Sequence, residues 1–212
     1  MTVDLVMTKN PAFIHPDASL NDAKALMSKY HIGKLPVLDA RNRLAGLVTK
    51  KDLLSAGPSA ATPLDMYEIS YLLSKITVEK IMVKQVITVR TEEVVEEAAR
   101  IMADNGIGCL PVMDGPVLAG IITESDLFRA FIGMFGAREP GVRVTFLAEE
   151  KPGALAAVTH TLSGLNANIV ALVTYPGDNI SNKRCTIKAD GISREQMRSA
   201  LEQSGVVIED VR

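Results

Sequence analysis

The chain has 212 residues, a formal net charge of −2 and a hydrophobic fraction of 47%, but aromatic residues make up only 4% of it. This charge gives no sign of nucleic acid or of an anionic membrane as a partner, and no stretch reaches the ~18 uncharged apolar residues of a membrane span. The N-terminus lacks a basic region followed by a long apolar run, so we expect no signal peptide. Cys109 and Cys185 lie in different segments and are expected to be reduced thiols of a cytoplasmic protein.

The first two thirds of the chain contain the same pattern twice. The matching segments are residues 7–9 and 82–84, 32–39 and 107–114, and 44–53 and 118–127. Two copies of a small unit usually pack against each other, because neither can bury its apolar face alone. We therefore expect a pseudo-twofold pair of units, with ligand sites in the shared cleft.

Each copy is predicted to fold as strand, helix, strand, strand and helix. In the second copy we expect a strand at 86–89, a helix that opens at Thr91, strands at 109–112 and 117–123, and a helix at 125–135. In the first copy Ser19 and Asp22 form a capping-box pattern at the start of a helix. Residues 64–75 have apolar side chains at helical spacing and predict an amphipathic helix between the copies. That helix either packs on the surface of its own unit or docks a partner.

The remainder of the chain follows a different pattern. Strands are expected at 142–148, 169–174, 184–188 and 206–211, with helices after Pro152-Gly153 and after Ser193. The resulting order, βαββαβ, is the ferredoxin-like motif. The predicted class is therefore α+β, with the chain divided into repeat 1 (1–57), a connecting helix (58–75), repeat 2 (76–135), a linker (136–141) and a C-terminal domain (142–212).

A threonine three residues before an aspartate stands at the same place in both copies, where an apolar strand meets a helix. The pairs are Thr49 with Asp52, and Thr123 with Asp126. One interpretation is structural, because Thr-x-x-Asp is a variant of the N-terminal capping box. The other is functional: the carboxylate accepts hydrogen bonds from ribose hydroxyls while the threonine hydroxyl and helix N–H groups meet phosphate. The repetition of the motif favours nucleotide binding.

The two copies resemble a pair of CBS domains, a Bateman module. The resemblance covers residues 1–135 and rests on a Leu-Pro-Val strand followed by Gly-hydrophobic-hydrophobic-Thr-x-x-Asp, which occurs twice. It implies that AMP, ADP, ATP or S-adenosylmethionine binds in the cleft, with Thr49, Asp52, Thr123 and Asp126 holding ribose and phosphate. The residues that this resemblance places around the base are Ile14, Lys34, Leu35, Pro36, Thr88, Leu110 and Pro111.

The copies differ in charge beside the cleft. The first has Lys34, Lys50 and Lys51 where the second has Cys109, Glu124 and Ser125. This excess predicts that the cavity with Thr49 and Asp52 prefers the more phosphorylated ligand; alternatively, the lysines are simply solvated. Arg129 is a further phosphate candidate. Cys109 is interpreted as a packed small residue rather than a reactive thiol.

Residues 142–212 resemble an ACT domain. The motif consists of Lys151-Pro152-Gly153-Ala154-Leu155 followed by residues 166–169. The resemblance implies an amino-acid site bordered by Gly153, Ala154, Leu155, Asn168 and Ile169, often at a dimer interface. The alternative is a domain without effector that serves only to hold a homodimer.

Two CBS units followed by an ACT domain resemble the AcuB family of acetoin utilisation, which implies a regulatory accessory role toward some enzyme. No histidine spacing signals a metal, and no glycine loop or nucleophile elbow is present, so we expect no catalytic residue and no cofactor. The sequence thus predicts a non-enzymatic ligand sensor. Two alternatives stay open: an interaction dimer with empty clefts, and an enzyme of unrecognised chemistry whose turnover depends on Asp52 or Asp126.

Overall fold

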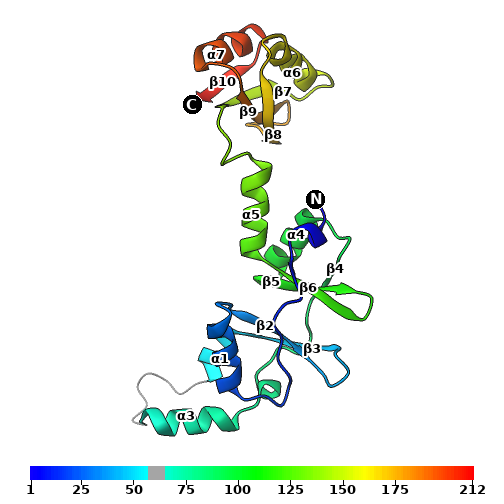
Figure 1. The fold of residues 1–212 in the computed structure, drawn as a ribbon. Helices are drawn as coiled ribbons and strands as arrows, with labels where there is room; N and C mark the ends of the chain where they lie inside the picture. Colours follow the sequence, from blue (N-terminus) through cyan, green and yellow to red (C-terminus); the bar gives the residue numbers. More distant parts are fainter. Residues whose placement is uncertain (57–64) are drawn as a thin grey trace. The chain divides into compact units, whose positions relative to one another are not determined.

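Residues 1–56 and 65–212 are described by the computed structural model, which separates into two units, Met1–Leu127 and Phe128–Arg212 (Figure 1). The first copy contains α1 (Leu20–Lys29), β2 (Lys34–Leu38), β3 (Leu44–Thr49) and α2 (Lys50–Ala56). The second contains β4 (Val89–Arg90), α4 (Val95–Asn105), β5 (Cys109–Asp114), β6 (Val117–Thr123) and α5 (Glu124–Met134). Two 3₁₀ turns (Val3–Leu5 and Val78–Lys80), β1 (Thr8–Lys9) and α3 (Met66–Lys75) complete this part of the chain.

The opening segment of each copy pairs with the other copy. Strand β1 runs antiparallel to β6, with Thr8 opposite Ile121, in a sheet of order β1-β6-β5-β4. In the same way Val83, which opens the second copy, exchanges backbone hydrogen bonds of 3.0 and 2.9 Å with Leu47 in β3. The repeated segments 7–9 and 82–84 therefore lock the two copies together within the first unit.

Apolar side chains at the expected spacing form the interior of each copy. In the first copy the buried cluster comprises Ile14, Ala23, Met27, Leu35, Val37, Val48 and Val78. Ser19 caps α1 as predicted, because its hydroxyl accepts from the N–H of Asp22 and the Asp22 carboxylate accepts from the N–H of Ser19. A smaller cluster of Leu47, Cys109 and Ile121 combines side chains from both copies.

The second copy departs from its prediction at its first strand and helix. The strand is Val89–Arg90 rather than 86–89, and the helix begins at Val95 rather than Thr91. The cause is the N-terminal segment: the carbonyls of Glu93 and Thr91 accept from the N–H groups of Val3 and Asp4, at 2.7 and 3.1 Å. The carbonyls of Thr91 and Glu93 therefore bond to a neighbouring segment and are not available to a first helical turn.

The connecting helix is observed as α3, whose N-cap Asp65 accepts from the N–H groups of Tyr67 and Glu68. The part of the predicted 58–75 segment before residue 65 lies outside the described residues. Helix α3 lies beside α1, within its own unit.

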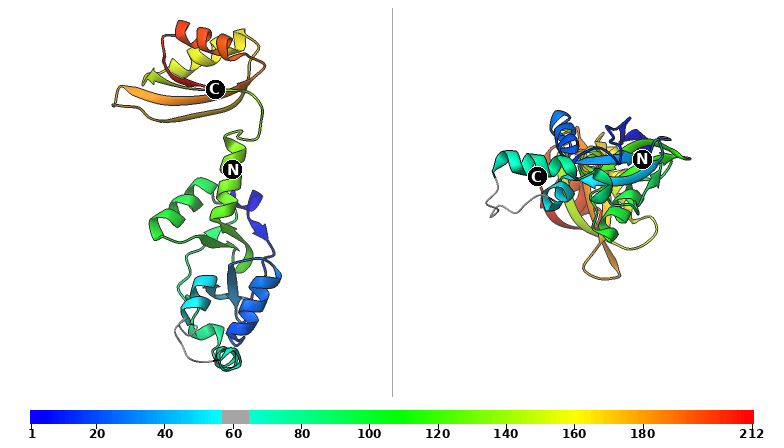
Figure 2. Two further views of the ribbon diagram at one scale, coloured as in Figure 1. Left: turned by 90° about the vertical axis from the view of Figure 1, so that its left-hand side faces the viewer. Right: turned by 90° about the horizontal axis from the view of Figure 1, so that it is seen from below.

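The second unit contains β7 (Val142–Glu149), α6 (Ala154–Gly164), β8 (Asn168–Pro176), β9 (Asn182–Asp190), α7 (Arg194–Gln203) and β10 (Val207–Val211). The order βαββαβ is the one predicted, and the antiparallel sheet runs β10-β7-β9-β8. Helices α6 and α7 lie on one face of this sheet (Figure 2). The core between them and the sheet comprises Val144, Phe146, Ala148, Val158, Leu162, Cys185, Ile187, Ala189, Met197 and Leu201.

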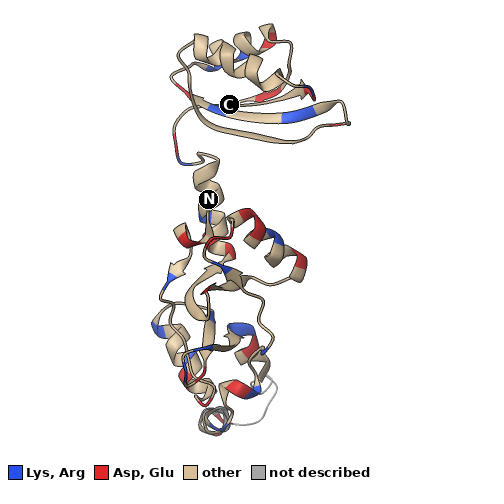
Figure 3. Ribbon diagram, turned by 90° about the vertical axis from the view of Figure 1, so that its right-hand side faces the viewer, with Lys and Arg blue, Asp and Glu red and all other residues tan. Residues whose placement is uncertain are grey.

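Charged residues of both signs are interspersed along the described ribbon (Figure 3). On α4, for example, Arg100 lies between Glu97 and Asp104 and pairs with both. Among the described residues no helix is long and apolar enough to cross a membrane.

Candidate functional site

The Thr-x-x-Asp motifs have the same geometry in both copies. Strand β3 ends at Thr49, and the Oδ2 atom of Asp52 accepts from the Thr49 N–H at 2.8 Å and from the Thr49 hydroxyl at 2.7 Å. Strand β6 ends at Thr123, where the Oδ2 atom of Asp126 accepts from the same two groups at the same distances. In the first copy the Asp52 N–H also donates to the Thr49 hydroxyl at 3.3 Å, which gives the reciprocal bonds expected at a helix N-terminus.

In these four bonds the acceptor is always the Oδ2 atom of the carboxylate. Asp52 is half-buried, whereas Asp126 is only 3% exposed. An ionised carboxylate has two acceptor oxygens and about four lone-pair directions. Capping and ligand binding are therefore compatible at Asp52, whose Oδ1 atom takes part in neither of these two bonds.

The base-bordering residues divide into buried side chains and exposed ones. Leu35, Pro36, Leu110, Pro111 and Ile14 are buried in the interiors of the copies. Strand pairing places them beside the motifs, since Lys34 lies opposite Thr49 and Cys109 opposite Thr123.

Thr88, Lys50 and Arg129 are exposed. Thr88 lies just before β4, Lys50 is the first residue of α2, and Arg129 is on α5. Arg129 belongs to the second unit, whereas the two motifs belong to the first.

Lys34 makes a contact that the sequence did not reveal. Its Nζ atom donates to the carbonyl oxygen of Gly108, in the second copy, at 2.6 Å. A Cβ atom built on Gly108 would lie 2.6 Å from Oε2 of Glu124 and 3.3 Å from Nζ of Lys34, so these two charged side chains approach the Gly108 backbone closely. The charge difference between the copies is therefore concentrated where they meet.

Cys109 lies beside this cluster and is 4% exposed. Burial raises the pKa of the Cys109 thiol to about 11, with Lys34 acting in the opposite direction and Glu124 in the same one. A thiol with this pKa is protonated at neutral pH and is a poor nucleophile. The interpretation of Cys109 as a packed small residue agrees with this environment.

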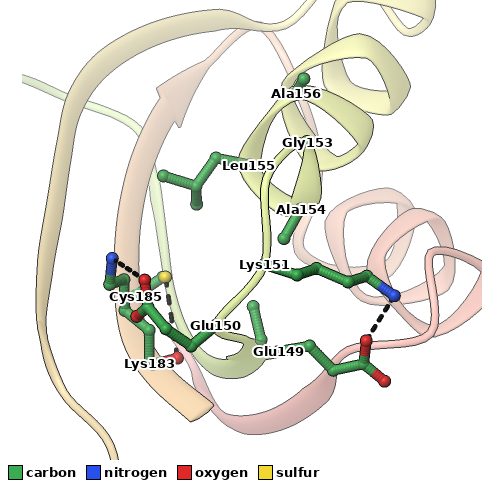
Figure 4. Close-up of a pocket in the computed structure, with 10 residues that line it drawn as sticks. Glu149, Glu150, Lys151, Gly153, Ala154, Leu155, Ala156, Lys183 and Cys185 are labelled. Carbon is green, nitrogen blue, oxygen red and sulfur yellow. Dashed lines mark hydrogen bonds and ion pairs between the residues drawn. The ribbon is translucent and has the colours of Figure 1, made fainter. Parts of the chain in front are cut away.

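The predicted amino-acid site is only partly assembled within one chain. Gly153, Ala154 and Leu155 line a hollow of about 180 Å³ together with Glu149, Glu150, Lys151, Lys183 and Cys185 (Figure 4). Lys183 pairs with Glu150 at 2.7 Å, and Lys151 pairs with Glu149. The hollow therefore carries both signs of charge above an apolar floor.

Asn168 and Ile169 do not line this hollow. They begin β8 and pair with Asp190 and Ala189 at the end of β9, whereas Lys183 and Cys185 lie near its beginning. Helix α6 runs back along the sheet before β8 starts, and this return separates the two halves of the motif. In a single copy of the chain, the predicted five-residue site is not brought together.

Among the described residues no group of three His, Cys, Asp or Glu side chains is placed to hold a metal ion. Gly153 has φ +85°, a backbone conformation that favours glycine.

Residues 3–59 and 78–133 match the CBS domain family, and the chain belongs to this family. The fold of the first unit is thus a CBS pair, a class of module that is typically regulatory.

Three solved structures are similar to this pair. A putative acetoin utilization protein (AcuB) from Vibrio cholerae is 34% identical with a TM-score of 0.54, over 66% of this chain and 96% of that one. The CBS domain pair of protein MJ0100, in complex with 5-methylthioadenosine and S-adenosyl-L-methionine, is 28% identical with a TM-score of 0.53, over 66% and 98%. CBSX2 in complex with AMP is 32% identical with a TM-score of 0.51, over 62% and 96%.

Enzymes also share the CBS part. L-aspartate semialdehyde sulfurtransferase from Methanocaldococcus jannaschii is 30% identical over 60% of this chain and 23% of the enzyme. Inosine-5'-monophosphate dehydrogenase from Nitrosopumilus maritimus is 31% identical over 58% of this chain and 22% of the enzyme. The chain spans less than a quarter of these relatives.

Proposed function

We propose that the CBS pair binds an adenosine ligand and that the protein is a non-enzymatic regulator which responds to that ligand. The observation that carries this proposal is the Thr-x-x-Asp geometry, repeated with the same hydrogen-bond distances at the ends of β3 and β6. Two similar CBS structures contain adenosine compounds, AMP in one and S-adenosyl-L-methionine with 5-methylthioadenosine in the other. These complexes support the choice of ligand class.

In this proposal the aspartate carboxylates accept hydrogen bonds from the ribose hydroxyls. The threonine hydroxyls and backbone N–H groups donate hydrogen bonds to phosphate. Asp52 keeps its capping bonds through Oδ2 and offers Oδ1 to ribose. The strands with Leu35-Pro36 and Leu110-Pro111 supply backbone groups to the base, because their side chains are buried. Ligand binding shifts the arrangement of the two copies only if the ligand has different affinities for the two arrangements.

The two clefts are proposed to be unequal. The first-copy lysines, Lys50 and Lys51 above all, are exposed beside Thr49, whereas Glu124 stands at the position equivalent to Lys50. Phosphate groups are therefore attracted by the lysines at the first motif and repelled by Glu124 at the second. ATP is expected to bind the cleft of Thr49 and Asp52 more tightly than AMP does, and two equal ATP sites would contradict this.

For the second unit we propose an ACT domain that binds an amino acid or holds a homodimer in the cytoplasm. The hollow at Gly153 supports the first role, since its lysines and glutamates match the two charges of a zwitterion. Asn168 and Ile169 complete the predicted site only if a second copy supplies them. A regulatory role in acetoin utilisation, toward an unidentified enzyme, is proposed from the resemblance to AcuB.

One observation favours a different function. The hydrogen bonds of Asp52 and Asp126 to their own threonines explain the motifs as helix caps without any ligand. In this second candidate the protein is an interaction dimer with empty clefts.

Thermal unfolding of the purified full chain with AMP, ADP, ATP, S-adenosylmethionine and a set of amino acids separates these candidates. A ligand at 100 times its Kd stabilises the folded state by about 2.7 kcal/mol. A sensor shows this shift with at least one adenosine compound. An unchanged melting temperature with every nucleotide would contradict the sensor and favour the interaction dimer.

A further inference from the structure

The sheet of the second unit has a cavity on the face opposite α6 and α7. Its volume is about 410 Å³, and Phe135, Arg143, Ala171, Val173, Tyr175, Thr186 and Lys188 line it. This volume lies within the range of small-molecule sites, roughly 300–1,000 Å³. The residues are separate from the hollow at Gly153, with which this cavity shares no lining residue.

The floor of the cavity is set by strand register. Arg143 in β7 lies directly opposite Lys188 in β9, and Lys188 lies opposite Ala171 in β8. Two residues along, Thr186 lies opposite Val173. Because side chains alternate along a strand, these positions share one face of the sheet, with two cations at one end and small apolar groups beside them.

The wall comes from the end of α5 and is fixed by backbone geometry. Gly136 has φ +56°, and the bonds from Gly136 N–H to Gly133 and from Ala137 N–H to Ile132 form a Schellman motif. The Nζ atom of Lys188 donates to the Gly136 carbonyl at 2.8 Å. These bonds hold the preceding residue, Phe135, at the rim of the cavity.

The pairing of Arg143 with Lys188 is unfavourable in the absence of an anion. Like charges directly opposite each other in a sheet are destabilising. Asp210 offsets part of this charge, since its Oδ2 atom accepts from Arg143 at 3.4 Å, but the same oxygen also accepts from Arg212 at 2.8 Å. One carboxylate is thus shared by two guanidinium groups, and the bond to Gly136 uses one of the three protons of Lys188.

The opposite end of the cavity offers hydroxyl groups. Thr186 Oγ1 lies 3.0 Å from Thr145 Oγ1 and 3.4 Å from the Tyr175 hydroxyl. These groups donate or accept, and so suit a neutral polar substituent. The aromatic rings of Phe135 and Tyr175 and the side chains of Ala171 and Val173 suit an apolar body.

We propose that this cavity binds a small organic carboxylate with an apolar or aromatic body and no amino group. Its carboxylate bridges the guanidinium of Arg143 and the ammonium of Lys188, which explains why two like charges face each other there. An ammonium group on the ligand would be repelled by the same pair, so amino acids are excluded from this cavity. The site is independent of the proposed nucleotide and amino-acid sites.

The test uses the full chain and four phenyl probes that differ in their polar group: phenylacetate, phenylalanine, phenethylamine and 2-phenylethanol. Binding is measured by ligand-observed NMR and by calorimetry, with probe concentrations up to about 10 mM because ligands of this size bind in the micromolar to millimolar range. We expect phenylacetate to bind at least tenfold more tightly than phenethylamine and 2-phenylethanol, and we expect phenylalanine not to displace it from this cavity. Equal binding of phenylacetate and 2-phenylethanol, or no binding of phenylacetate, would overturn the proposal.

Variants locate the site. Lys188→Gln and Arg143→Gln are expected to weaken phenylacetate binding at least tenfold, and Lys183→Gln, on the same strand but in the other hollow, is the matched control. Circular dichroism and thermal unfolding check the fold of each variant. Phe135→Ala, a substitution outside the sheet, should also weaken phenylacetate binding. Unchanged affinity in Lys188→Gln and Arg143→Gln, or an equal loss in Lys183→Gln, would place the carboxylate elsewhere and contradict the assignment.

Discussion

Lys34 donates from its Nζ atom to the carbonyl oxygen of Gly108 at 2.6 Å, and this bond joins the first CBS copy to the second. The same carbonyl accepts from the backbone N–H of Glu124 at 3.3 Å, while its counterpart in the first copy, Gly33, accepts from the N–H of Lys50 at 2.8 Å. The pseudo-twofold pattern is thus broken at one place by a charged side chain. This place lies between the two candidate nucleotide motifs.

Replacement of this lysine should destabilise the CBS pair. Hydrogen bonds to charged groups contribute about 1.5–3 kcal/mol, so we expect Lys34→Met to lower the free energy of unfolding by about 1–2 kcal/mol. Urea denaturation measures the change. Lys50→Met, at an exposed position near the same turn, should change stability by less than about 0.5 kcal/mol, and equal losses in both variants would refute a specific role for the bond to Gly108.

The segments that open each copy, residues 7–9 and 82–84, pass so close to the strands of the other copy that these strands need glycine at the contact. A Cβ atom built on Gly120 would lie 2.8 Å from the carbonyl oxygen of Thr8, and one on Gly46 would lie 2.9 Å from that of Val83. Backbone has to move to relieve such contacts, and we expect each glycine-to-alanine variant to lose about 1–3 kcal/mol. Gly133→Ala, in α5 with open space around its Cβ position, should instead gain up to about 1 kcal/mol. Chemical denaturation of the three variants measures these changes in the free energy of unfolding. A Gly120→Ala variant as stable as the wild type would contradict the prediction.

We expect ionisation of the buried Cys109 thiol to lower the stability of the folded state at alkaline pH. Burial raises its pKa to about 11 in the folded state, whereas an unfolded cysteine ionises near pH 8.5. As the pH rises, the folded state keeps this proton longer than the unfolded chain does. The free energy of unfolding is therefore unaffected below about pH 8.5 and declines between about pH 8.5 and pH 11. Within that window the wild type should lose up to about 1.4 kcal/mol more per pH unit than Cys109→Ala.

The measurement is denaturant unfolding at a series of pH values. Cys185→Ala, which keeps the Cys109 thiol, should retain the Cys109 share of the decline. Parallel profiles for the wild type and Cys109→Ala would contradict the role of this buried thiol.

Local signals predicted local structure well. The capping pattern of Ser19 and Asp22 forms as expected, and the βαββαβ order of the second unit follows from its apolar runs and turn residues. The Thr-x-x-Asp motifs were found for the same reason, because a strand end, a threonine and a helix start are adjacent in sequence.

Features that depend on pairing between distant segments could not be predicted. Nothing in residues 7–9 indicates that they pair with β6 of the other copy. Nor does the sequence show that Val3 and Asp4 bond to Glu93 and Thr91, the contact that moves the start of α4 from Thr91 to Val95. The contact of Lys34 with Gly108 has the same origin. The opposition of Arg143 and Lys188 depends on register, which periodicity alone does not set.

The account's central claim is that Asp52 and Asp126 bind a ligand and do not merely cap helices. Asp22 provides a matched control, because its Oδ2 atom accepts from the Ser19 N–H at 3.0 Å and from the Ser19 hydroxyl at 2.7 Å, the same capping arrangement away from the strand-to-helix turns. The decisive measurement is calorimetric titration of the wild type, Asp52→Asn, Asp126→Asn and Asp22→Asn with the adenosine compound that gives the largest thermal shift. We predict at least tenfold weaker binding at one or both sites in the first two variants and unchanged binding in Asp22→Asn. Equal affinities in all four proteins, or no heat of binding with any adenosine compound, would show that the motifs are caps alone.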